Sequence, residues 1–126
     1  MNHRPVYLNL LQIRLPVTGF VSILHRASGV ILFLLLPGLL WVLDQSLRSE
    51  ETWQSLYTAL HQPWVQWVAG GFLLALVFHL LAGLRHLFMD IHIGESLQEA
   101  RWSAKLVILV TVVCAIGLMA WIWRTQ

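Results

Sequence analysis

Three long stretches of this chain are almost uniformly apolar, at about residues 20–43, 64–87 and 104–123. Each is long enough to cross, as an α-helix, a hydrocarbon core about 30 Å thick, for which roughly 20 residues suffice. Of the 126 residues, 58% are hydrophobic and only 11% are charged, far from the composition of a soluble domain of this length. The sequence therefore predicts a single all-α membrane domain over residues 1–126, with three transmembrane helices.

The segments outside these stretches are polar, and their cationic residues are unevenly distributed. Residues 1–19 are expected to lie at the membrane interface, and residues 44–63 and 88–103 to form loops, the first with a short helix on the membrane surface. Pro37 is expected to kink the first helix. Cytoplasmic segments are enriched in Lys and Arg. This rule predicts a cytoplasmic N-terminus and a periplasmic C-terminus, because six cations fall on one side (Arg4, Arg14, Arg26, Arg85, Arg101 and Lys105) and two on the other (Arg48 and Arg124).

The composition also argues against several classes of function. The chain carries 8 Lys and Arg against 6 Asp and Glu, too few cations for the basic patch that nucleic-acid binding requires. Its single cysteine, Cys114, rules out an internal disulfide and a CxxC metal site. The sequence has no glycine-rich phosphate loop, no paired carboxylates within a span and no catalytic triad, so hydrolytic or covalent catalysis by this chain alone is not expected.

Polar residues gather at one end of the first span. Ser22, His25 and Arg26 stand at i, i+3 and i+4 and therefore share one helix face, and Ser28 follows. The arginine and the serines also have ordinary structural explanations. An arginine near a helix end can extend to the headgroups, and a helix serine often bonds to its own backbone.

The second span returns to the same boundary with His79, Gly83, Arg85 and His86. His79 and His86 are seven residues apart, almost in register on one face, and His79 lies roughly 10 Å deeper at about 1.5 Å per residue. An ionisable residue at this depth is a functional-site hypothesis by default, although it can also serve only as a hydrogen bond between helices. A deep imidazole, a small neighbour, and Arg and His nearer the water together match the needs of a haem: an axial ligand, space, and cations for the propionates.

Only one deep histidine is present, so a six-coordinate haem would take its second ligand from another chain, which predicts an obligate partner. The other histidines, His3, His61 and His92, are expected to be solvated.

Two blocks of sequence resemble the cytochrome b large membrane-anchor subunit of succinate dehydrogenase, respiratory complex II. The first is Ser22-Ile23-Leu24-His25-Arg26-Ala27-Ser28-Gly29, similar to the family signature S-I-x-H-R-x-[ST]-G. The second begins at His79 and continues through Gly83-Leu84-Arg85-His86 to Asp90, similar to H-x-x-x-G-[aliphatic]-R-H-x-x-x-D. Arg4-Pro5 and Ser103-Ala104-Lys105 are also similar, so the resemblance extends over nearly the whole chain.

The resemblance implies roles for particular residues. His79 matches the axial ligand of a haem b held between this subunit and a small hydrophobic anchor subunit, which supplies the second ligand. His25, Arg26 and His86 match the haem propionate region, and Ser22 and Arg26 match residues that line the ubiquinone pocket. Ser22 would donate to a quinone carbonyl, and Arg26 would stabilise negative charge developing on the quinone.

The resemblance also implies partners and a location. Succinate would be oxidised at the FAD of a flavoprotein subunit, and electrons would pass through the clusters of an iron–sulfur subunit to ubiquinone, in a bacterial inner membrane that this chain spans several times. Activity would belong to the complex and not to the isolated chain. Two alternatives stay open: the anchor of a quinol:fumarate reductase, and a haem-free structural anchor. A small transporter is disfavoured because the charges cluster at one boundary.

Overall fold

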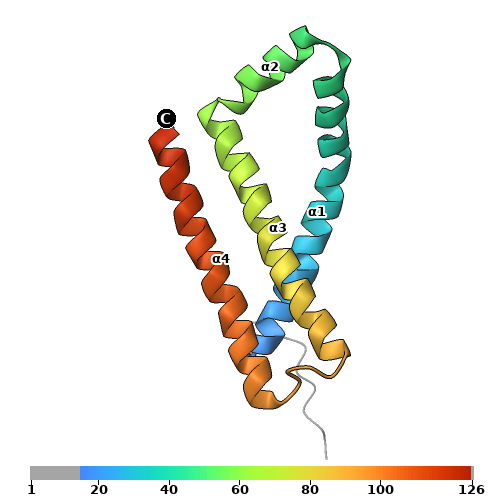
Figure 1. Ribbon diagram of the computed structural model, residues 1–126, viewed down its shortest axis with the longest axis vertical. Coiled ribbons are helices and arrows are strands. Elements are labelled where there is room, and N and C mark those ends of the chain that lie inside the picture. The colour runs from blue at the N-terminus through green and yellow to red at the C-terminus, as the bar shows by residue number, and fades with distance from the viewer. Residues whose placement is uncertain (1–14, 126) are drawn as a thin grey trace, which may run out of the picture.

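The computed structural model describes residues 15–125, which form four helices joined by short turns (Figure 1). Three of them, α1 (Val17–Arg48), α3 (Pro63–Asp90) and α4 (Leu97–Thr125), are long and apolar enough to cross a membrane, and α2 (Glu50–Leu60) is short. The predicted all-α fold with three membrane-spanning helices is therefore confirmed. Most of the interfacial segment predicted for residues 1–19 lies outside the described residues.

Local sequence signals set several helix ends. Pro16 precedes α1 and accepts the hydrogen bond from Phe20 N at 3.1 Å. Ser49 caps α2 in a reciprocal arrangement with Thr52, in which each side chain accepts from the other residue's backbone N–H. Pro63 opens α3 at a position where its missing N–H costs no helical hydrogen bond.

The helices extend beyond the apolar stretches that predicted them. Helix α1 continues to Arg48, which pairs with Asp44 at 2.5 Å. The short helix expected in the first loop is α2. The second loop was predicted over residues 88–103, but α3 ends only at Asp90 and α4 already begins at Leu97. Hydropathy identifies only the lipid-embedded part of a helix, whereas the helix itself continues for further turns made of polar residues. The short turn between α3 and α4 uses left-handed backbone at His92 (φ 64°) and Gly94 (φ 73°).

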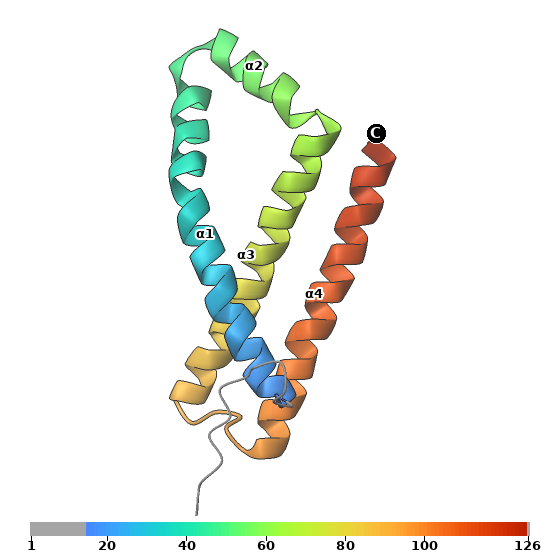
Figure 2. The ribbon, with the colours of Figure 1, turned by 180° about the vertical axis from the view of Figure 1, so that it is seen from behind.

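The three long helices converge at one end of the molecule and separate at the other. In Figures 1 and 2, α3 and α4 run side by side, and α1 crosses α3 close to the turn between α3 and α4. A small core forms at this crossing; its buried members are Val21, Phe78, Ala82, Ala104 and Val107. Towards the other end α1, which passes through Pro37 and bends along its length, leaves α3, and α2 connects the two. The crossing therefore brings the polar end of α1 against the polar end of α3.

At the far end, α3 and α4 approach each other through Gly70. A Cβ atom added to Gly70 would lie 3.1 Å from Ile122 Cδ1 and 3.2 Å from Leu118 Cδ2, so a larger residue would push the helices apart. Nearby, the Gln66 side-chain oxygen is buried and has no hydrogen-bond partner among the described residues.

Candidate functional site

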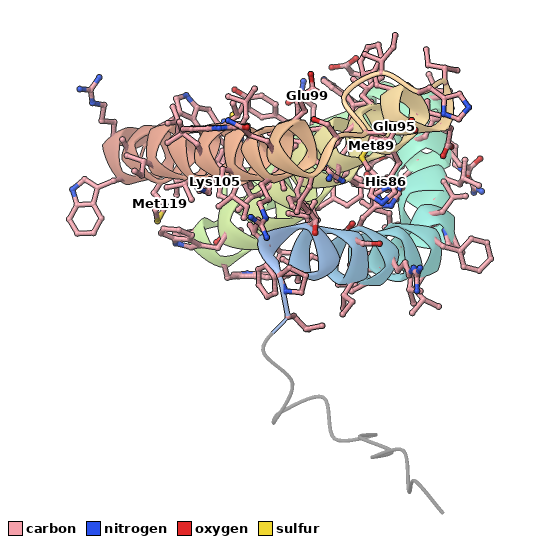
Figure 3. The ribbon with its side chains drawn as sticks, turned by 90° about the horizontal axis from the view of Figure 1, so that it is seen from below. His86, Met89, Glu95, Glu99, Lys105 and Met119 are labelled. Carbon is pink, nitrogen blue, oxygen red and sulfur yellow. The ribbon has the colours of Figure 1, made fainter. Side chains whose placement is uncertain are left out.

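Three histidines stack at the crossing of α1 and α3. The ring of His25 from α1 lies 4.3 Å, centroid to centroid, from the ring of His79, with 17° between the planes. On its other side, His25 lies 5.0 Å from His86, with 22° between the planes. Figure 3, seen from the end where α1 begins, shows His86 pointing from α3 towards α1. We call these three residues the histidine cluster; the structure thus brings together three of the five side chains predicted for the site.

The hydrogen bonds of His79 define which ring nitrogen is free. Its Nδ1 lies 3.2 Å from the backbone oxygen of His25 and 3.0 Å from Ser28 Oγ. A carbonyl can only accept, so Nδ1 carries the proton, and Ser28 Oγ, which itself donates to His25 O at 2.8 Å, accepts from it. Among residues 15–125 no hydrogen bond reaches Nε2, and this nitrogen keeps its lone pair.

This pattern is the one that orients metal-ligating histidines in proteins. An imidazole that binds a metal through one nitrogen usually donates its other N–H to a backbone carbonyl or another acceptor, which fixes the tautomer and the ring orientation. His79 has this arrangement through Ser28 and the His25 carbonyl. His86 has a similar one, since its Nδ1 donates to Ala82 O at 2.7 Å.

Two glycines allow the rings to approach the facing backbones. A Cβ atom on Gly29 would lie 3.0 Å from His79 Cε1, and one on Gly83 would lie 3.2 Å from His25 Nε2. Both distances are shorter than ordinary van der Waals contact. The glycines in the two signature blocks are therefore required by the packing of α1 against α3.

Ser22 and Arg26 are placed at the edge of this arrangement. Ser22 is half-buried and Arg26 is exposed. Neither side chain forms a hydrogen bond or ion pair with any of residues 15–125. Among the described residues, hydrogen bonds and stacking do not join them to the histidine cluster, so their donors remain available to a ligand or another chain.

Arg85 does not join the histidines, although the sequence grouped it with His86 as a cation for the same ligand. Its Nε donates to Ser103 Oγ at 3.0 Å and its Nη2 to Ala100 O at 3.1 Å, both on α4, and its side chain is buried. Successive residues are about 100° apart around a helix, so Arg85 and His86 cannot share a face. His79 and His86 turn to α1, whereas Arg85 turns to α4.

Sequence reasoning missed the importance of Ser28. The residue was noted only as a polar member of the first span, yet it is 7% exposed and holds His79 in place. Its position three residues after His25, on the same helix face, was the available signal.

The hydrogen bonds of His61 and His92 do not involve the histidine cluster. His61 and His92 are exposed, as predicted; His61 Nδ1 contacts Tyr57 O at 2.7 Å and His92 pairs with Glu95 at 2.8 Å. His3 lies outside the described residues. Cys114 is a free, exposed thiol on α4.

The chain is similar to known proteins over nearly its whole length. Residues 1–118 match the family described as succinate dehydrogenase/fumarate reductase transmembrane subunit. The succinate dehydrogenase cytochrome b556 subunit of Coxiella burnetii is 38% identical over 121 residues, 95% of this chain and 97% of that protein. The protein of the same description from Paracoccus denitrificans is 31% identical over 115 residues, 90% of this chain and 88% of the relative. The succinate dehydrogenase hydrophobic membrane anchor subunit of Halobacterium salinarum is 31% identical over 94 residues, 74% of this chain and 72% of the relative.

Proposed function

We propose that this chain, which belongs to the succinate dehydrogenase/fumarate reductase transmembrane subunit family, binds a haem b through His79 and contributes Ser22 and Arg26 to a ubiquinone site. The family predicted from the two signature blocks is confirmed. The chain is a cytochrome b-type membrane-anchor subunit of succinate dehydrogenase and a multi-pass protein of the bacterial inner membrane.

One observation carries the haem proposal: the Nδ1 of His79 is occupied by two acceptors, while none of residues 15–125 forms a hydrogen bond to Nε2. A neutral imidazole in this tautomer is the usual axial ligand of a haem iron. Haem iron, when bound, supplies one-electron transfer, and the polypeptide supplies ligand orientation and local electrostatics. Ser28 and the His25 carbonyl would hold the His79 ring in the orientation that ligation requires.

The residues around His79 fit such a group. Gly29 and Gly83 let the rings of His79 and His25 pack against the facing helices, which would hold the ligand in place; the space beside Gly83 that the sequence assigned to the haem is filled by His25. His86 and His25 lie towards the end of the molecule at which α1 begins, and Arg26 is exposed there. These side chains, as donors and cations, would hold the propionates near the membrane surface, where carboxylates remain solvated.

A second axial ligand would come from a partner chain. His25 stacks directly on the ring of His79 at 4.3 Å, so it would not serve as the second ligand. We therefore propose a small hydrophobic anchor subunit as the source of the second histidine, together with the flavoprotein subunit, which holds FAD, and the iron–sulfur subunit.

At the quinone site, the roles would be binding and electrostatic stabilisation. The Ser22 hydroxyl would donate to a ubiquinone carbonyl, and the Arg26 guanidinium would stabilise negative charge that develops on the ring as electrons arrive from the iron–sulfur subunit. Support comes from the placement of both side chains at the end of α1, without hydrogen bonds to residues 15–125.

The test separates quinone reduction from succinate oxidation. In membranes whose complex carries Arg26→Leu, we expect succinate-dependent ubiquinone reduction to fall about a hundredfold, the loss typical of removing one preorganised donor. Succinate oxidation by phenazine methosulfate, which takes electrons before the quinone, should be unchanged. Arg124→Leu, at the opposite end of the molecule, is the matched control. Equal rates of quinone reduction in the Arg26→Leu and control membranes would show that Arg26 is not part of the quinone site.

A further inference from the structure

A groove lies between the end of α3 and the start of α4, on the side of α3 that carries Arg85. Its volume is about 380 Å³. Apart from Arg85 and Ser103, it is lined by apolar residues and Gly94. We call it the Arg85 groove; its lining includes Leu81, Arg85, Ser103, Leu106 and Val110.

Arg85 is a buried cation that forms no ion pair with the residues that the structure describes. Its side chain is 7% exposed, and the ion pairs within residues 15–125 involve only Arg48 with Asp44 and His92 with Glu95. Its partners, Ser103 Oγ and Ala100 O, are neutral and engage Nε and Nη2. Among the described residues nothing accepts from Nη1. A buried charge is costly unless it is paired, so this position calls for an anion.

We propose that the Arg85 groove binds an anionic phospholipid of the bilayer, with the phosphodiester at Arg85 and an acyl chain along Leu81, Leu106 and Val110. A guanidinium matches phosphate oxygens through two parallel hydrogen bonds. Arg85 lies five residues before the end of α3, about 7.5 Å along the helix at about 1.5 Å per residue, and Leu81 lies one turn deeper. The groove therefore presents a cation near the membrane surface and an apolar wall towards the membrane interior.

The charge of Arg85 decides between possible occupants. A neutral lipid headgroup or a quinone would fill the apolar wall but leave the guanidinium uncompensated. Anionic lipid is abundant beside cytoplasmic cationic segments, and this end of the molecule is the one predicted to be cytoplasmic from its Lys and Arg residues. This inference does not depend on haem or quinone binding.

The test measures lipid binding to the full chain, purified with its co-purifying subunits and stripped of lipid. Native mass spectrometry would follow titration with phosphatidylglycerol and, separately, phosphatidylcholine of the same acyl chains. We expect Arg85→Gln, which retains an amide donor but not the charge, to weaken phosphatidylglycerol binding about tenfold, as expected for loss of one charge-assisted contact. Phosphatidylcholine binding should not change. Arg101→Gln, which removes an exposed charge from α4, is the matched control and should change neither lipid.

A second variant guards against a folding defect in Arg85→Gln. Val110→Phe leaves Arg85 intact and fills the acyl-chain part of the groove, and it should also weaken phosphatidylglycerol binding. Equal phosphatidylglycerol binding in wild type and either variant would overturn the proposal. So would equal wild-type affinity for both lipids, which would indicate an apolar occupant, or displacement of the lipid by millimolar inorganic phosphate, which would indicate a free anion.

Discussion

Helix α3 has two polar faces that lie close together and do different things. The face with His79 and His86 meets α1 through stacked rings and leaves one nitrogen of His79 without a hydrogen bond to any of residues 15–125. The face with Arg85 meets α4, and there the guanidinium bonds to a hydroxyl and a carbonyl. Depth in the membrane is therefore a poor guide to the role of a polar residue. A better guide is what the unbonded polar atoms of that residue face.

The largest effect is expected from Gly29→Leu, a change on α1 that would disrupt its contact with the histidine face of α3. A Cβ atom added to Gly29 would lie only 3.0 Å from His79 Cε1, so the larger leucine must displace the ring or separate the helices. Overpacking of this kind costs up to about 3 kcal/mol, which corresponds to about a hundredfold in binding. Haem content per complex, measured by pyridine haemochrome, should fall accordingly.

Gly117→Leu is the control for that substitution. Gly117 is also helical, but nothing lies within 4 Å of its added Cβ atom. Its variant should keep the haem content of the wild type. If both leucine variants lose haem equally, the effect is one of general stability and the close approach at Gly29 has no special role.

Arg85→Leu is expected to have the next largest effect, on the other face. It removes two hydrogen bonds between α3 and α4, and its free energy of unfolding in detergent should fall by about 2 kcal/mol. Haem content measured under native conditions should be retained, because the hydrogen bonds of the Arg85 guanidinium go to α4 and none reaches the histidine cluster within residues 15–125. A variant that stays fully stable but loses haem would show that the two faces are not independent.

Ser28→Ala tests how His79 is held. The hydroxyl accepts from Nδ1, but the His25 carbonyl remains as a second acceptor, so the loss should be only about 1 kcal/mol, or roughly fivefold in haem affinity. The midpoint potential of the haem should rise, since a weaker acceptor at Nδ1 makes the ligand less basic. Thr111→Ala removes a hydroxyl that bonds to its own helix at Val107 O and should change neither quantity. An unchanged potential in Ser28→Ala would mean that the carbonyl alone orients the ring.

The smallest effect is expected far from both faces, at Gln66. Its side-chain oxygen is buried without a partner among the described residues, so Gln66→Met should raise the free energy of unfolding by roughly 0.5 kcal/mol. Thermal unfolding of the isolated chain and of the assembled complex would check this. A loss of stability confined to the complex would show that a partner subunit donates to Gln66.

Much of this architecture follows from hydropathy and helical periodicity. The apolar stretches predicted the three spanning helices, and the spacing of seven residues placed His79 and His86 on one face. Helical periodicity also predicts that Arg85 and His86 lie on different faces of α3. The two were grouped as one set of cations because they lie at a similar depth in the membrane. The ends of the helices were less predictable, because the turns of α3 and α4 outside the apolar stretches depend on capping and on the left-handed backbone at His92 and Gly94.

The spacing of Ser28 from His25 placed it on the same helix face, but its hydrogen bond to His79 could not be derived from the sequence. It depends on how α1 crosses α3, which is set by close contacts at Gly29 and Gly83 and by the small core around Val21. Crossing geometry is a property of two surfaces together, and a single helix pattern does not contain it.

The most direct test of the central claim is a dithionite-reduced minus oxidised visible spectrum of the complex that contains this chain, recorded for wild type, His79→Leu and His61→Leu. The account predicts a sharp α-band of low-spin b-type haem in wild type and in His61→Leu, whose exposed histidine lies at the opposite end of the molecule, and loss of that low-spin band in His79→Leu. An unaltered band in His79→Leu, or no band in a wild-type complex that still reduces quinone, would contradict it.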